Sequence, residues 1–144
     1  MLKMIELVNR QRKIKIVADD WLKFSEKAIE AIKETKGKSV TIAFVSDRKM
    51  RELNFEFRGK NLTTDVLSFP NEPDEFDFGE PTLGDIVISI EQAQRQAAEN
   101  NLTLDAEIKQ LILHGILHLC GYDHETDNGK MNRMELKLRD KLEI

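Results

Sequence analysis

The histidines of this sequence are confined to one short segment, HGILHLCGYDH, which runs from His114 to His124. The chain has 3 histidines in 144 residues, and all of them fall in this segment. His114 and His118 are four residues apart, so in a helix both imidazoles project from one face and can bind one ion. Gly121 can end that helix in a left-handed turn, which allows His124 to approach the pair. The spacing predicts three nitrogen ligands and an open fourth position, the arrangement typical of catalytic zinc.

A metal is the preferred explanation of this cluster, although a single histidine on an apolar helix face is usually a hydrogen-bonded core residue. Two buried imidazoles would each need a buried partner, and one shared ion satisfies both. Imidazole ligands also suit nickel, copper or iron. Cys120 is a further candidate ligand, but its place after the helix end favours packing as a small apolar residue. Asp123 or Asp127 could hold an imidazole in place, and each is equally consistent with a solvated loop acid.

The histidine spacing is also that of the metzincin peptidases, in which a glutamate directly after the first histidine acts as the general base. Gly115 occupies that position here. A peptidase mechanism therefore loses the carboxylate that activates its water. The likeness lies in the metal ligands and does not extend to the reaction.

The elements that must position the histidines follow from hydrophobic periodicity, which predicts an α/β (α+β) fold with about four strands in a mixed sheet and about five helices. Strands are predicted at residues 4–9 or 13–17, 38–46, 64–69 and 84–90. Helices are predicted at residues 19–37, 47–57, 91–100, 105–121 and 130–142. Asp19 and Asp20 are expected to cap the first helix, and Ser89 with Gln92 has the form of a capping box. The histidine-bearing helix has few polar positions, which predicts a buried central helix.

Composition restricts the class of protein further. Hydrophobic residues make up 40% of the chain and charged residues 33%, and there is a single cysteine. No segment is typical of a secretory signal or a membrane span, so we expect a cytoplasmic protein without membrane contact. The net charge of -4 is unevenly distributed, because residues 1–64 carry 15 Lys and Arg against 9 Asp and Glu. A basic face that binds nucleic acid is therefore possible within the first half.

Three separated segments, LNFEFRGKNLTTDVLSFP, LGDIVISIEQA and HGILHLCGYDH, together resemble the YbeY family of bacterial endoribonucleases. The resemblance implies one YbeY-like metal-dependent hydrolase domain over residues 1–144. It implies a single-strand-specific endoribonuclease that acts in ribosomal RNA maturation, at the 3′ end of the small-subunit RNA, and in ribosome quality control. It also implies that His114, His118 and His124 bind zinc, that Arg58 is the important arginine of the cleft, and that TTDVLSFP lines its wall.

The residues themselves are compatible with phosphodiester cleavage, which needs a Lewis acid and cationic donors for the charge that develops on the oxygens. Arg58 can supply a bidentate donor. Further candidates for substrate binding or for supporting the metal ligands are Lys60, Asp65, Ser68, Asp85 and Asp123. The expected partners are single-stranded RNA, in particular ribosomal RNA, and the ribosome or ribosomal proteins. Two alternatives stay open: a metzincin-like metallopeptidase, and a noncatalytic, zinc-containing ribosome-assembly factor.

Overall fold

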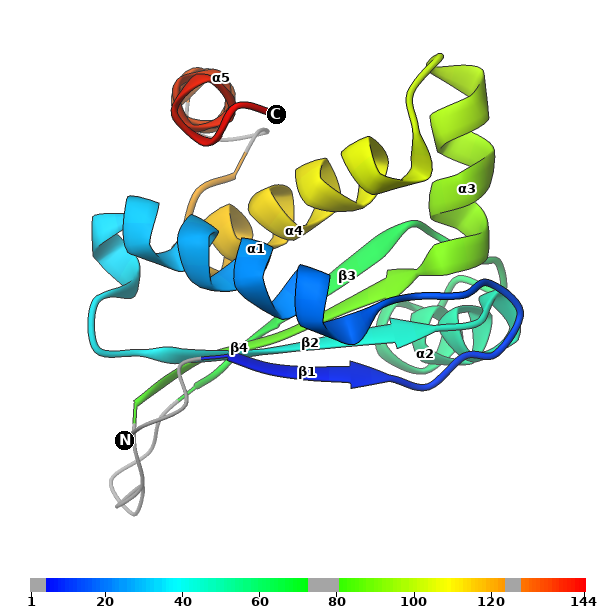
Figure 1. The fold of residues 1–144 in the computed structure, drawn as a ribbon. Helices are drawn as coiled ribbons and strands as arrows, with labels where there is room; N and C mark the ends of the chain where they lie inside the picture. The colour runs from blue at the N-terminus through cyan, green and yellow to red at the C-terminus, as the bar shows by residue number, and fades with distance from the viewer. Residues whose placement is uncertain (1–4, 73–80, 124–127) are drawn as a thin grey trace.

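A computed structural model describes residues 5–72, 81–123 and 128–144 of the chain. The elements follow one another in the order β, α, β, α, β, β, α, α, α, with a short 3-10 helix after the first α-helix (Figure 1). The strands are β1 (Ile5–Asn9), β2 (Ser39–Val45), β3 (Val66–Pro70) and β4 (Thr82–Ser89). The helices are α1 (Ala18–Ala31), η1 (Lys33–Thr35), α2 (Asp47–Arg58), α3 (Ile90–Glu99), α4 (Leu104–Leu119) and α5 (Lys130–Leu142). The predicted order of elements is confirmed.

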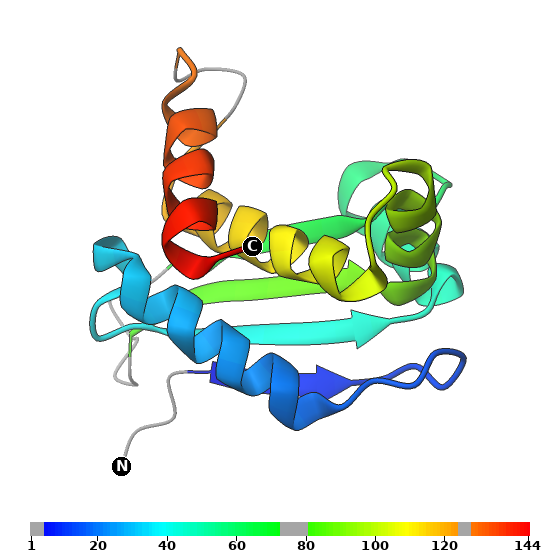
Figure 2. The ribbon, with the colours of Figure 1, turned by 45° about the horizontal axis from the view of Figure 1, so that its top comes forward.

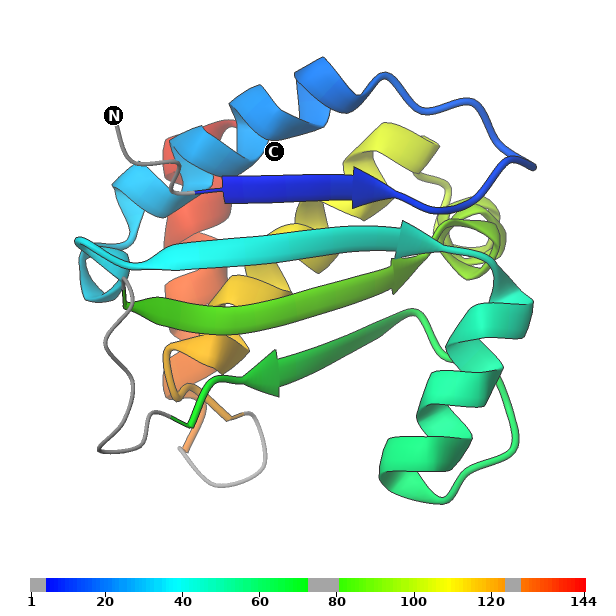
Figure 3. The same cartoon turned by 90° about the horizontal axis from the view of Figure 1, so that it is seen from below.

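The four strands form one mixed sheet in the order β1-β2-β4-β3. β1 pairs with β2, and β2 with β4, in parallel, whereas β3 pairs with β4 in the antiparallel direction. This confirms the predicted mixed α+β sheet and the hairpin-like pairing of β3 with β4. The first strand is the earlier of the two predicted candidates. Because β3 lies at the edge of the sheet, one side of it remains available to form the wall of a cleft (Figure 3).

The main hydrophobic core lies between the sheet and the helices on one of its faces (Figures 1 and 2). Helix α4 contacts both β3 and β4, and α5 contacts α1 and α4. Ile86 and Ile88 of β4 point into this core, together with Ile112 and Ile116 of α4, and all four are fully buried. Each such side chain stabilises the fold by roughly 1.5–3 kcal/mol relative to an exposed one. The histidine-bearing helix is thus the predicted buried central helix.

A smaller core lies on the opposite face of the sheet. Val45, Met50, Leu67 and Val87 are buried together there, and Met50 comes from α2. Viewed from this side, the four strands lie in front of α1, α4 and α5, and α2 lies beside one end of the sheet (Figure 3). The two faces of β4 therefore contribute to different cores, as expected from the alternation of side chains along a strand.

The helix ends are only partly as predicted. Val17, and not an aspartate, is the residue that precedes α1, and it makes no side-chain capping bond. Asp19 and Asp20 lie in the first turn, where a negative charge still opposes the helix dipole. The capping role of Ser89 is confirmed, since its hydroxyl accepts a hydrogen bond from the Gln92 N–H at the start of α3.

Along the described ranges, no helix combines the length and the apolar character that crossing a membrane requires.

Candidate active site

A cleft of about 670 Å³ lies where the end of α2, strand β3 and helix α4 meet. It is lined by Phe57, Arg58, Thr64, Asp65, Val66, Leu67, Ser68, Phe69, Pro70, His114 and His118. Two parts of the chain that are far apart in the sequence, residues 57–70 and the histidine-bearing helix, thus line one cleft. The segment TTDVLSFP supplies most of its wall, and α4 supplies the two histidines.

The histidine pair has the geometry that its helical spacing predicts. His114 and His118 lie one turn apart in α4, and their Nε2 atoms are 2.9 Å from each other. The two rings are nearly perpendicular, with an interplanar angle of 77°. Both side chains are partly buried and both line the cleft, so the two nitrogens converge at a point that a ligand in the cleft can reach.

Glu135 holds the first of these imidazoles from the opposite side. Its Oε1 lies 2.7 Å from Nδ1 of His114, and its Oε2 accepts a hydrogen bond of 3.3 Å from Nη2 of Arg139. The Glu135 side chain is only 7% exposed. A carboxylate at Nδ1 favours the imidazole tautomer that is protonated there, which leaves the lone pair on Nε2. Nε2 is the atom that faces His118.

Sequence reasoning missed Glu135, although a signal for it exists. The buried residues of α5 are Met131, Glu135, Leu138 and Leu142, at helical spacing. Glu135 is therefore a carboxylate inside the apolar stripe of the helix, where an unpaired charge would be costly. Its position predicts a buried partner of complementary chemistry, but only the fold shows that this partner is His114.

The two histidines present imidazole nitrogens, which are suitable metal ligands, and the distance between these nitrogens is close to that of two ligands on one ion. Two nitrogens bound to one tetrahedral zinc are about 3.3 Å apart, so the observed 2.9 Å needs an opening of a few tenths of an ångström. Within residues 5–72, 81–123 and 128–144 no group of three or more metal-ligating side chains is gathered. The predicted third ligand, His124, lies outside the described residues, as does Asp127.

The cleft brings three of the other predicted residues beside the histidines. Arg58, Asp65 and Ser68 all line it, and Arg58 is exposed at the last turn of α2. The Asp65 carboxylate is held by the backbone N–H of Val66 at 2.8 Å and by Nε2 of Gln96 at 3.1 Å. These bonds hold the start of the cleft wall against α3.

The remaining predicted residues lie elsewhere. Lys60 is exposed just after α2 and is not part of the cleft lining. Asp85 is exposed on β4, and because Ile86 beside it points toward α4, Asp85 points to the opposite face of the sheet. Asp123 is partly buried after the end of α4 and is also outside the cleft lining. The fold therefore does not bring Asp85 to the histidines.

Cys120 lies in a different hollow, lined by Lys33, Glu34, Cys120, Gly121, Tyr122, Lys130 and Met134. It packs against the main core and is not among the residues that line the histidine cleft. Burial, together with the charge of Glu34, raises the pKa of the Cys120 thiol to about 11, so it is neutral at pH 7. A neutral thiol in the core is the packing role expected from its place in the sequence.

Gly115 faces the sheet and not the cleft. A Cβ added at this position would lie 2.8 Å from a methyl carbon of Ile86. The glycine thus allows α4 to approach β4 closely, which is a packing reason for its presence. A glutamate at this position would meet the core, so the peptidase base has no room here.

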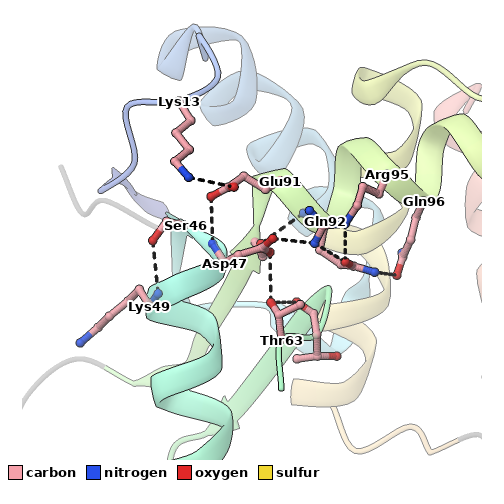
Figure 4. Close-up of polar contacts among 11 residues, drawn as sticks. Lys13, Ser46, Asp47, Lys49, Thr63, Glu91, Gln92, Arg95 and Gln96 are labelled. Carbon is pink, nitrogen blue, oxygen red and sulfur yellow. Dashed lines mark hydrogen bonds and ion pairs between the residues drawn. The ribbon is translucent and has the colours of Figure 1, made fainter. Parts of the chain in front are cut away.

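A second polar cluster lies at the junction of α2 and α3 (Figure 4). We call it the Asp47 cluster, and it comprises Asp47, Thr63, Ser89, Glu91 and Arg95. The Asp47 carboxylate accepts hydrogen bonds from Ser89 at 2.6 Å, Thr63 at 3.1 Å and Arg95 at 2.6 Å. The N–H of Asp47 donates to the Glu91 carboxylate at 3.0 Å. The cluster joins the first turns of two helices to the loop that precedes β3.

Comparison with known proteins identifies the family. The family model described as Endoribonuclease YbeY matches residues 6–143. This chain belongs to that family. A relative named Endoribonuclease YbeY from Thermodesulfovibrio yellowstonii is 38% identical over 93% of this chain and 94% of its own. Another of the same name from Nautilia profundicola is 48% identical over 74% of each chain.

A solved structure supports the same fold. The solution structure of TM1509 from Thermotoga maritima is 30% identical, has a TM-score of 0.65, and is matched over 96% of this chain and 89% of its own. The resemblance inferred from the three sequence segments is therefore confirmed for the family and for the fold.

Proposed function

We propose that this protein is a metal-dependent endoribonuclease that cleaves single-stranded RNA in the cleft beside His114 and His118. Membership of the Endoribonuclease YbeY family supports hydrolysis of RNA phosphodiester bonds. The observation that carries the location of the site is the convergence of two imidazole nitrogens in a cleft that also contains an arginine. The proposed biological substrate is ribosomal RNA during maturation and ribosome quality control, in the cytoplasm and in contact with the ribosome.

We propose zinc as the bound ion, with nickel as the next candidate. His114 and His118 would hold it through Nε2, and His124 would be the third ligand. Such an ion supplies Lewis acidity toward a phosphate oxygen. Glu135 keeps His114 in the tautomer that presents a lone pair, and its near-complete burial shields that hydrogen bond from water.

Arg58 is the proposed donor to the phosphate. Its guanidinium carries a fixed positive charge and can make two parallel hydrogen bonds to phosphate oxygens. The residue ends α2 and lines the cleft opposite the histidine helix, so it can reach a phosphate that lies between them. Charge that develops on the oxygens during cleavage would be stabilised by this cation.

A metallopeptidase is the less favoured reading of the same ligands. The position that carries the general base in those enzymes is Gly115, which packs on Ile86 and faces away from the cleft. Replacing Gly115 by glutamate would push a carboxylate into the core, and we expect it to destabilise the protein and not to create a peptidase.

The test is a paired assay of the chelated protein and the protein reloaded with zinc, on single-stranded RNA, duplex RNA and casein. Of the three substrates, we expect only single-stranded RNA to be cleaved, and only by the protein reloaded with zinc. His118→Ala should lose most of its metal by elemental analysis and most of its activity, while its circular dichroism stays that of a folded protein. Turnover of RNA at the same rate with and without metal would contradict the proposal, and efficient turnover of casein would favour the peptidase.

A further inference from the structure

Two phenylalanines of α2 are exposed to an unusual extent, and they differ in where they point. Phe55 is 59% exposed and Phe57 is 58% exposed. Only Phe57 lines the histidine cleft. Residues two apart in a helix lie on different sides of it, so the two rings do not form one continuous apolar patch. The feature to be explained is therefore the exposed aromatic ring of Phe57 inside the cleft.

The Phe57 ring is supported from one side by a second aromatic ring in the cleft wall. Phe57 and Phe69 meet edge to face, with centroids 5.0 Å apart and an interplanar angle of 64°. Phe69 belongs to β3 and packs on the smaller core, so it has a fixed position. Gly84 of β4 adopts a φ of 135°, and a Cβ there would overlap the Phe69 backbone. Phe69 thus offers the exposed Phe57 ring a neighbour of fixed position before any ligand arrives.

We propose that Phe57, supported by Phe69, is a stacking platform for one unpaired base of the RNA, next to the phosphate held near Arg58. The inference rests on the proposed function and adds the subsite that recognises the base. Phe57 and Arg58 are adjacent in the chain and line the same cleft as the histidines. The phosphate of a nucleotide whose base stacks on Phe57 would therefore lie near Arg58 and near the histidines.

A stacking platform explains selectivity for single strands in physical terms. A base in a duplex is already stacked and paired, so it must be extracted before it can occupy the ring, whereas an unpaired base can stack at little cost. Stacking of one base on an aromatic side chain contributes about 5- to 100-fold in affinity. Because every base has an aromatic face, the platform should select for unpaired bases more than for a particular sequence.

The competing explanation is a protein-docking surface that includes Phe57. Of the exposed apolar side chains Phe55, Phe57 and Leu62, however, only Phe57 lines the cleft. Continuity of the Phe57 ring with Arg58 and the histidines favours RNA. If Phe57 docks a protein and not a base, Phe57→Leu should leave RNA binding unchanged, which the experiment below measures.

The experiment compares Phe57→Leu and Phe57→Tyr with the matched control Phe55→Leu, all in the zinc-loaded protein. Leucine keeps apolar volume and removes the aromatic face, whereas tyrosine keeps the face. We expect Phe57→Leu to weaken binding of a single-stranded RNA oligonucleotide by about 5- to 100-fold, measured by fluorescence anisotropy. Phe57→Tyr and Phe55→Leu should stay within about threefold of the parent, since both variants keep an aromatic ring at position 57. Thermal midpoints confirm that the variants are folded.

A second measurement identifies stacking itself. A single abasic position is moved along the oligonucleotide, and the position that weakens binding to the parent should have no effect on Phe57→Leu, because the two changes remove one contact. The platform is refuted if abasic positions affect both proteins equally, or if Phe57→Leu and Phe55→Leu behave alike. These binding results decide the platform even if the parent does not cleave RNA, an outcome that would count against the proposed function alone.

Discussion

The histidine cleft and the Asp47 cluster are both concentrations of polar side chains, but their contents differ. In the Asp47 cluster a carboxylate is matched by donors from three other side chains, and opposite charges are paired within the protein. In the cleft, two imidazole nitrogens converge to 2.9 Å from each other, and an arginine from another helix lines the same cleft. The Asp47 cluster thus pairs its own opposite charges. The cleft instead presents imidazole nitrogens that suit a metal cation and an arginine that suits an anion.

The difference teaches that a well hydrogen-bonded polar cluster is not by itself a functional site. The Asp47 carboxylate accepts three side-chain hydrogen bonds, from Thr63, Ser89 and Arg95, and these bonds join α2, α3 and the loop before β3. In the cleft, hydrogen bonds hold side chains that face a ligand: Glu135 orients His114, and Gln96 holds Asp65. If this comparison is correct, substitutions in the two regions should affect different properties of the protein.

The largest effect is expected for Arg58→Gln, which removes the cationic fork and keeps much of the stem. Loss of one donor to developing charge typically lowers a rate by about 10²–10³. RNA cleavage by the zinc-loaded protein should fall by that factor, while metal content and thermal midpoint stay close to the parent's. Arg58→Lys should recover only part of the rate, because an ammonium cannot make the bidentate contact. Parental cleavage by Arg58→Gln would remove Arg58 from the site, and Lys60 would be tested next.

Glu135→Gln should have the next largest effect, on metal affinity. Partners of this kind typically contribute about 10- to 100-fold to metal binding, because they orient the imidazole and raise its basicity. The zinc dissociation constant, measured by competition with a chelating dye, should rise by about that factor. Nitrogen NMR of the zinc-free protein should show a changed tautomer balance at His114, which a merely structural role would not produce. An unchanged dissociation constant would mean that Glu135 acts only through Arg139 and packing.

Asp47→Asn should have the smallest effect on cleavage and act on stability. Burial works to raise the pKa of Asp47, but hydrogen bonds from Ser89, Arg95 and Thr63, with the charge of Arg95, outweigh it and lower that pKa below its usual value of 3.8. A lowered pKa in the folded state means that the carboxylate stabilises the protein above pH 3.8 and loses that contribution as the pH falls through the folded pKa.

At pH 7 we therefore expect Asp47→Asn to reduce the free energy of unfolding by about 1–3 kcal/mol. The difference from the parent should shrink below about pH 4, as measured by denaturant titration across the pH range. Cleavage at a temperature well below the thermal midpoint should stay within about threefold of the parent. A large loss of activity without loss of stability would contradict the contrast between the two regions and place the Asp47 cluster in the functional site.

Local periodicity and spacing determined a large part of this protein. The order of strands and helices follows from patterns with a reach of a few residues, such as the apolar stripe of each helix and the cap at Ser89. The meeting of His114 and His118 is equally local, since a helix brings residues four apart to one face. The family, too, could be inferred from three segments whose letters are specific in combination.

Only the tertiary structure decided which distant groups join the histidines. It placed Glu135 of α5 behind His114 and the ring of Phe57 at the cleft, and it sent Asp85 to the opposite face of the sheet. Alternation along β4 shows that Asp85 and Ile86 point in opposite directions, but not which face α4 covers. The face that α4 covers depends on packing between elements, in which Gly115 allows α4 to lie against Ile86. The sequence pattern of a single element does not determine which face that is.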